Sequence, residues 1–205
     1  DLGPAVGAGG ALLDYLREVR GPELRHVVRA RRLGARDFMV LDATTRRNLE
    51  LTASLLGEGR DLTLLGAIDR TLTSLGARRL RAWLERPLVR RDAIEARLDA
   101  VEELVNRTEE TELLAETLRR FRDLERLLGK AACGKASPRD LRALGEGALA
   151  TPELRERLGM FRAAVLRDFA TATPDLSALG RRLDEALVDV PPLAVGEGGV
   201  FRPGW

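Results

Sequence analysis

The stretch DAIEARLDAVEELVNRTEETELLAETLRRFRDLERLL, residues 92–128, decides the fold. Its apolar residues recur at the three- and four-residue spacing that puts them on one face of an α-helix. Asp92 and Glu95 stand where a capping box would start the first helix. Two successive helices are predicted from two apolar stripes: Ile94, Leu98, Val101, Leu104 and Val105, then Leu114, Leu118, Phe121, Leu124 and Leu128.

Three later positions carry a hydroxyl residue followed by proline, at Ser137–Pro138, Thr151–Pro152 and Thr173–Pro174. A hydroxyl side chain caps the first turn of a helix, and proline is tolerated at the first helical position because no donor is needed there. Each pair therefore predicts the start of a new helix. The pair Pro191–Pro192 is expected to end the helical region.

The N-terminal part of the chain carries a weaker helical signal. Residues 10–20 place Leu12, Leu13, Leu16 and Val19 on one face and are followed by Gly21–Pro22, a stop signal. Residues 37–41 read as a short strand. The fold class predicted is all-α, an elongated multi-helix domain with at most short strands near the ends.

Composition narrows the function. Lys+Arg 34 against Asp+Glu 32 leaves a net charge of only +2, so any contact with nucleic acid must be local. One cysteine and one histidine, Cys133 and His26, offer neither an internal disulfide nor a metal-ligand cluster. No apolar run approaches the roughly 20 residues that span a bilayer, which predicts a cytoplasmic protein without a membrane partner.

The segment from Gly129 to Ser137 fits the phosphate-loop pattern as far as Lys135. The next residue is Ala136, where the motif needs a magnesium-holding Ser or Thr, and helical periodicity precedes the loop in place of a strand. We therefore interpret the segment as a connector between two helices. We expect the isolated chain neither to bind nor to hydrolyse ATP.

Arginines form two clusters that could contact DNA phosphates. Arg46 and Arg47 are the first, and the second is Arg78, Arg79, Arg81, Arg86, Arg90 and Arg91. The competing interpretation is that the second cluster pairs within the chain with acids that are close in sequence: Asp69, Glu85, Asp92 and Glu95. The low net charge favours this interpretation. The carboxylate pairs Glu102–Glu103 and Glu109–Glu110 are interpreted as solvated faces. Four aromatic residues, Phe38, Phe121, Phe161 and Phe169, are expected on core faces, so none of them reads as a wedge that could enter a DNA duplex.

Taken in order, the motifs resemble the core or lever region of the MutS family of DNA mismatch-repair proteins. Residues 41–51, LDATTRRNLEL, are similar to the family's L-D-x-x-T-x-x-N-L-E-L. Residues 69–88, from Asp69 to Leu88, resemble its D-x-T-x-T-x-x-G-x-R block, which ends in W-L-x-x-P-L. Further matches follow at residues 94–101, 123–126, 138–141, 191–192 and 198–200.

The resemblance implies a division of the chain and roles for single residues. Residues 1–20 would end the connector domain, and residues 21–205 would be the first segment of the core, stopping before the clamp. This fragment would carry no catalytic, cofactor or metal site. Arg46 and Arg47 are candidate DNA-backbone contacts, and five residues are expected to support packing or coupling: Asp42, Asn48, Trp83, Leu84 and Asp140.

The resemblance also implies the setting of the full-length protein. That protein would be a bacterial, homodimeric ATPase using ATP and magnesium, with mismatched double-stranded DNA and a MutL-type repair protein as partners. The core would transmit conformational change between the ATPase and the DNA-binding clamp. The alternative is a free-standing helical interaction scaffold unrelated to DNA.

Overall fold

The computed structural model describes residues 3–20, 27, 29, 37–57, 59–193, 196 and 198–205. The chain divides into two compact units, residues 1–34 and 35–205. The first unit contains helix α1 (Gly3–Arg20), which confirms the helix expected at residues 10–20 and starts earlier. His26 and the stop signal Gly21–Pro22 lie outside the described residues.

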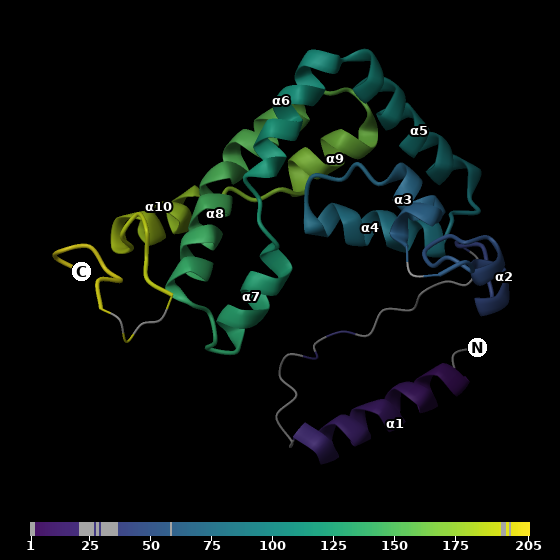
Figure 1. Ribbon diagram of the computed structural model, residues 1–205, viewed down its shortest axis with the longest axis horizontal. Helices are drawn as coiled ribbons and strands as arrows, with labels where there is room; N and C mark the ends of the chain where they lie inside the picture. The colour runs from purple at the N-terminus through teal and green to yellow at the C-terminus, as the bar shows by residue number, and fades with distance from the viewer. Residues whose placement is uncertain are drawn as a thin grey trace. The chain divides into compact units, whose positions relative to one another are not determined.

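The second unit is helical, which confirms the all-α fold class (Figure 1). The strand expected at residues 37–41 is a single antiparallel bridge, Phe38 to Leu88, and a second bridge joins Leu187 to Phe201. The helices follow in this order: α2 (Ala43–Asn48), the short η1 (Arg60–Leu62), α3 (Leu64–Ile68), α4 (Ser74–Glu85), α5 (Arg91–Asn106), α6 (Thr108–Arg119), α7 (Leu124–Ala132), α8 (Pro138–Gly159), α9 (Ala164–Ala172) and α10 (Ser177–Ala186).

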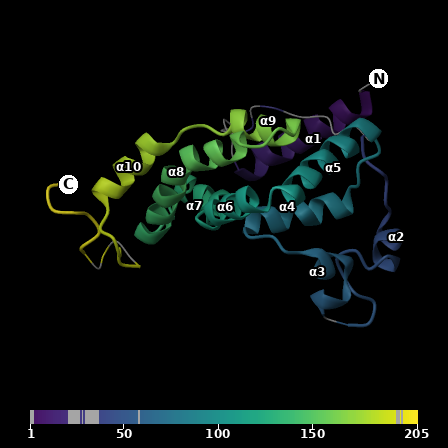
Figure 2. The ribbon, with the colours of Figure 1, turned by 90° about the horizontal axis from the view of Figure 1, so that it is seen from above.

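The main core lies where α5, α6, α8 and α9 meet, and Figures 1 and 2 show these four helices side by side. Phe161, in the turn between α8 and α9, is 2% exposed and fills the centre. Its buried neighbours come from all four helices: Ala100, Leu114, Leu158, Leu166 and Ala170. Burying a phenylalanine side chain stabilises a fold by about 1.5–3 kcal/mol, so this turn is fixed by its side chain as well as by its backbone.

The expectation that Thr151–Pro152 starts a helix is wrong, because α8 runs through both residues. Pro152 has no N–H, so the carbonyl of Ala148, four residues earlier, loses its usual partner. The Thr151 hydroxyl donates to that carbonyl at 2.8 Å. The same hydroxyl oxygen accepts the backbone N–H of Leu176 at 2.9 Å, just before α10. Thr151 thus supplies the hydrogen bond that Pro152 cannot make within α8, and it also binds the residue just before α10.

Other predicted boundaries are also corrected. Thr173 ends α9, and α10 begins later, at Ser177. Asp92 does not form a capping box, because α5 starts at Arg91 without a side-chain cap and Asp92 pairs with Arg90. The stripe at residues 114–128 is interrupted by a turn, since α6 ends at Arg119 and α7 begins at Leu124.

The stripe predicted along α5 reaches the core only in part. Leu98, Val101 and Val105 are 59%, 55% and 70% exposed, whereas Ala100 and Leu104 pack against Phe161 and its neighbours. Phe169, which was also expected on a core face, is exposed. Periodicity therefore located this helix, but it did not show that Leu98, Val101 and Val105 lie outside the core of this unit.

Glycines allow helices to approach closely on both sides of α8. A Cβ at Gly180 of α10 would lie 2.7 Å from Cγ of Leu149 and 2.8 Å from its backbone nitrogen. A Cβ at Gly145 would lie 3.1 Å from that of Leu183, and one at Gly147 would lie 3.2 Å from Cδ2 of Leu124. The two glycines in α8 are therefore contact points with α10 and α7 as well as weak helix formers.

Among the described residues, no helix is long and apolar enough to cross a membrane.

Candidate coupling contacts and nucleic-acid interface

Asp42 determines where α2 begins. Its Oδ1 accepts the backbone N–H of Thr45 at 2.6 Å, which is an N-cap hydrogen bond. This bond is the main reason that the pKa of Asp42 is lowered. Arg46 folds back over the same turn, where its Nε donates to the carbonyl of Leu41 at 3.0 Å.

The turn after α2 is held by Glu50, which has a φ of +45°. A left-handed backbone is unfavourable for residues other than glycine unless other contacts stabilise it. The Glu50 carboxylate supplies these contacts, since it accepts the Leu55 N–H at 2.7 Å and the Ser54 hydroxyl at 2.9 Å. Both hydrogen bonds lower the pKa of Glu50, with the Leu55 backbone as the larger cause.

This turn is attached to the start of α3. Leu64 and Leu65 donate their N–H groups to the carbonyls of Glu50 and Leu51, each at 3.0 Å. Leu51 and Leu65 are buried at this junction. The local motif of residues 41–51 therefore forms a compact platform together with α3.

The candidate DNA contacts lie on the exposed side of α2. Arg46, Arg47 and Asn48 are all exposed. Within the part of the chain that the structure describes, neither arginine forms an ion pair with a carboxylate. Their contact with DNA phosphate stays a prediction, as does the bracing role of Asn48.

Trp83 lies at the surface of α4 and not in the core. Its side chain is 38% exposed and lies under the guanidinium of Arg97, whose Cζ is 3.9 Å from the ring centroid. Arg79 lies on the ring at 5.7 Å. Trp83 therefore connects α4 to α5 through cation–π contacts, while Leu84 beside it is partly buried.

A charged contact between α4 and α7 was missed by sequence reasoning. Arg78 donates to both oxygens of Asp123 at 2.8 Å and to Glu125 at 2.9 Å. Asp123 also caps α7 by accepting the Arg126 N–H at 3.2 Å. The Arg78 guanidinium lowers the pKa of Asp123 to about 2, so the carboxylate is ionised at neutral pH.

The remaining arginines of that cluster largely pair as the low net charge suggested. Arg81 binds Glu85 at 3.0 Å, and Arg91 binds Glu95 at 2.7 Å. Arg90 pairs with Asp92. Intramolecular pairing is therefore confirmed for these three arginines, and Arg78 pairs with acids more distant in sequence than those expected.

Asp140 closes the start of α8. Its Oδ2 accepts the Ser137 N–H at 3.0 Å, and Ser137 Oγ accepts the Asp140 N–H at 3.2 Å, which completes a capping box. Lys130 of α7 donates to the same carboxylate at 2.9 Å. The Ser137 backbone, Lys130 and the Ser137 hydroxyl together lower the pKa of Asp140 to about 2.

Glu103 is not part of a solvated face, as had been expected, because it caps another helix. Its carboxylate accepts the N–H of Arg162 at 2.8 Å and that of Ala163 at 2.7 Å. Ala163 is the N-cap residue of α9 and has no side-chain cap of its own. The Ala163 N–H is the main cause of the lowered pKa of Glu103. We call this contact the Glu103 clasp.

Arg107 extends the Glu103 clasp toward the end of α8. Its Nη1 lies 3.5 Å from Oε1 of Glu103 and donates to the carbonyl of Met160. Its Nε donates to Glu110 at 3.1 Å, so Glu110 is also paired. The turn between α8 and α9 is consequently bonded to the junction of α5 and α6.

Gly129–Ala132 form the last turn of α7, and residues 133–137 are the connector to α8 that was predicted. Gly134, with a φ of +66°, follows the last turn of α7. Its N–H donates to Ala131 at 3.0 Å and that of Lys135 donates to Lys130 at 2.8 Å, the pattern of a Schellman C-cap. Across the described ranges, no group of His, Cys, Asp and Glu is placed to hold a metal ion.

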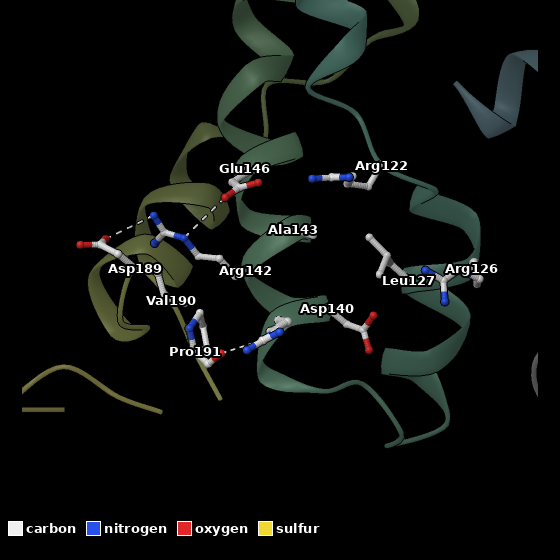
Figure 3. Close-up of a pocket in the computed structure, with 11 residues that line it drawn as sticks. Arg122, Arg126, Leu127, Asp140, Arg142, Ala143, Glu146, Asp189, Val190 and Pro191 are labelled. Carbon is white, nitrogen blue, oxygen red and sulfur yellow. Dashed lines mark hydrogen bonds and ion pairs between the residues drawn. The ribbon is translucent and has the colours of Figure 1, made fainter. Parts of the chain in front are cut away.

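A hollow of about 400 Å³ lies between α7, α8 and residues 189–191, and Figure 3 shows the side chains that line it. Arg142 lies across it and forms an ion pair with Asp184 of α10 at 2.6 Å. Arg139 donates from Nε to the carbonyl of Pro191 at 2.8 Å. These contacts join α10 and Pro191 to α8 and leave a surface rich in arginine.

Comparison with known proteins identifies the family. The family model of MutS domain III matches residues 44–203. The chain belongs to the MutS family. A DNA mismatch repair protein MutS from Anaeromyxobacter sp. (strain Fw109-5) is 44% identical over 200 residues, which are 98% of this chain and 23% of that protein. Those from Symbiobacterium thermophilum and Halothermothrix orenii are 43% and 38% identical over the whole chain, again 23% of each protein.

The chain therefore spans about a quarter of the MutS relatives that it matches. Most of the sequence-predicted residues fall inside the matched region, and Asp42 lies two positions before it. The clasp of Glu103 and the pairing of Arg78 with Asp123 also fall inside it. Of these two contacts, only the pairing of Arg78 with Asp123 had a signal in the sequence, since both residues belong to motif blocks of the family.

Proposed function

We propose that this chain is the helical core of a DNA mismatch-recognition protein, in which it transmits conformational change between an ATPase and a DNA-binding clamp located elsewhere in the full-length protein. Membership of the MutS family supports a mismatch-repair setting and disfavours an unrelated scaffold. ATP, magnesium, mismatched duplex, a MutL-type protein and a second copy would be ligands and partners of the full-length protein.

The observation that carries the mechanical role is the Glu103 clasp. A helix can transmit a rotation to its neighbour only if the ends of the two helices keep their relative position. Packed interfaces support this, because they shift between discrete arrangements more readily than they deform. In the clasp, the carboxylate of Glu103 in α5 accepts the N–H groups of Arg162 and Ala163, which lead directly into α9, at 2.7–2.9 Å. Carboxylate charge at a helix N-terminus is also favoured by the helix dipole.

Further charged contacts extend this rigid connection. Arg78 joins α4 to the start of α7, and Arg142 joins α8 to α10. Glu153 of α8 accepts from Arg120 at 2.6 Å, which ties the end of α6 to the same helix. We therefore assign α4 to α10 a structural role in coupling and place no catalytic step on this chain.

The test is the substitution Glu103→Gln in the full-length protein. The amide keeps the shape of the side chain but removes the charge that holds the N-terminus of α9. We expect slower ATP-triggered release from a G·T duplex in stopped-flow fluorescence, with duplex affinity unchanged when nucleotide is absent.

The matched control is Glu102→Gln, because Glu102 is exposed on the same helix. Hydrogen exchange at Arg162 and Ala163 checks that the clasp has opened in the Glu103 variant. Faster exchange at these amides together with a wild-type release rate would contradict the proposed coupling.

A further inference from the structure

Two adjoining hollows share three residues, Arg122, Arg142 and Glu146. The first is the hollow of Figure 3, and the second, of about 220 Å³, lies against the end of α6 and reaches α10. Six arginines and four carboxylates line the two hollows together: Arg119, Arg120, Arg122, Arg126, Arg139 and Arg142, with Asp140, Glu146, Asp184 and Asp189. The lining therefore has an excess of two positive charges, far more concentrated than in the chain as a whole.

The four carboxylates are already engaged. Asp140 binds Lys130 and Ser137, and Asp184 binds Arg142. Asp189 accepts from Arg202 at 2.7 Å, and Glu146 lies 3.7 Å from Arg142. The acids therefore pair with Arg142, Lys130 and Arg202, and they leave other arginines of the lining without a carboxylate partner among the described residues.

Three arginines of this lining carry no ion pair with any residue that the structure describes. Arg119 ends α6, Arg122 lies in the following turn, and Arg126 is in α7. All three are exposed, so their guanidinium groups are accessible to a ligand. Arg122 lines both hollows, and in Figure 3 its guanidinium points toward α8. We call Arg119, Arg122 and Arg126 the arginine row.

The row has the chemistry and the layout of a phosphate track. A guanidinium group presents a planar fork of donors that fits phosphate oxygens. The three groups are spread along a helix end, a turn and a second helix, beside two open hollows, and this layout suits a chain of phosphates better than one enclosed anion. We propose that the arginine row binds the backbone phosphates of duplex DNA.

This inference rests on the proposed mismatch-repair function, but it names a surface that neither the motifs nor Arg46 and Arg47 indicated. Phosphate contacts position a protein on DNA without reading sequence. The row is therefore expected to bind paired and mismatched duplex equally, in agreement with the lack of a wedge residue in the sequence.

The test compares two triple variants of the 205-residue chain by fluorescence anisotropy with a labelled, fully paired duplex. In the first, each arginine of the row is replaced by glutamine: Arg119→Gln, Arg122→Gln and Arg126→Gln. The control removes the same charge from exposed arginines that lie elsewhere and lack ion pairs with described residues: Arg155→Gln, Arg167→Gln and Arg182→Gln. Circular dichroism verifies that both variants are folded.

Each phosphate contact contributes about 0.9 to the slope of log K against log salt. The magnitude of this slope should be smaller by about 2 to 3 for the row variant than for the parent chain, whereas the control variant should keep the parental slope. A row variant with the parental slope overturns the proposal, and so does an equal loss in both variants.

A second arm separates DNA from a small anion by titrating the chain with inorganic pyrophosphate, against sodium chloride of matched ionic strength. We expect pyrophosphate to compete no better than chloride. Saturable pyrophosphate binding that the row variant abolishes, without any change in duplex affinity, would replace the proposal with a small-anion site. Failure in either arm leaves the clasp experiment, and hence the proposed coupling, untouched.

Discussion

The substitution Gly180→Ala tests the close packing of α8 against α10. The added Cβ would lie 2.7 Å from Cγ and 2.8 Å from the backbone nitrogen of Leu149. The nitrogen is part of the α8 backbone, so it cannot avoid the clash by a change of rotamer. Overpacking a tight contact costs about 1–3 kcal/mol, and a backbone clash favours the upper end. Alanine regains about 1 kcal/mol of helix propensity. The net expectation is a loss of about 2 kcal/mol.

Gly129→Ala in α7 is the matched control, because nothing lies within 4 Å of its added Cβ. Only the propensity gain applies there, so that variant should be more stable by up to about 1 kcal/mol. Urea unfolding followed by circular dichroism measures both, and the melting temperature of the Gly180 variant should fall by roughly 4–8 °C. A Gly180→Ala protein as stable as the parent would refute the reasoning about this interface.

Three further outcomes are expected. Trp83→Ala should cost about 2 kcal/mol in urea unfolding, below the roughly 3–5 kcal/mol of a fully buried aromatic, because the ring is 38% exposed; a larger loss would return Trp83 to the core. Thr151→Val should cost about 1–3 kcal/mol because it leaves the Ala148 carbonyl and the Leu176 N–H without their partner, and Thr151→Ser should restore most of the stability; equal melting of all three proteins would contradict this. The folded-state pKa of Asp123 is about 2 against an ordinary 3.8, so its contribution to stability is present above about pH 4 and is lost as pH falls toward 2. The difference in unfolding free energy between the parent and Asp123→Asn should therefore shrink over that range. A difference that does not change with pH would count against the Arg78 contact.

Much of the fold could be predicted from the sequence because helical periodicity and capping are local signals. The start of α8 at Ser137–Pro138 is an example, since the capping box lies within four consecutive residues. Thr151–Pro152 carries the same local signal and gave a wrong boundary. There the hydroxyl serves a carbonyl inside α8 and an N–H at residue 176, a long-range contact that no local pattern contains.

The candidate contacts were less predictable for a related reason. The role of Asp42 at the start of α2 depends on a residue three positions away, and the sequence motif included both. The Glu103 clasp joins residues 59 and 60 positions apart, and Gly180 is explained only by its contact with Leu149. The resemblance implied a packing or coupling role for Trp83, but no pattern in the sequence indicates that its ring stacks against Arg97.

The claim that the helices from α4 to α10 form one rigid connection is tested most directly by a distance measurement between spin labels on α5 and α8 in the full-length protein. Glu102→Cys and Glu156→Cys place labels on exposed positions of the two helices, and Cys133→Ser removes the exposed native thiol. The account predicts one narrow distance distribution between the labels that stays unchanged when ATP releases the protein from a G·T duplex. A shifted or broadened distribution on ATP addition would contradict rigid transmission through this core.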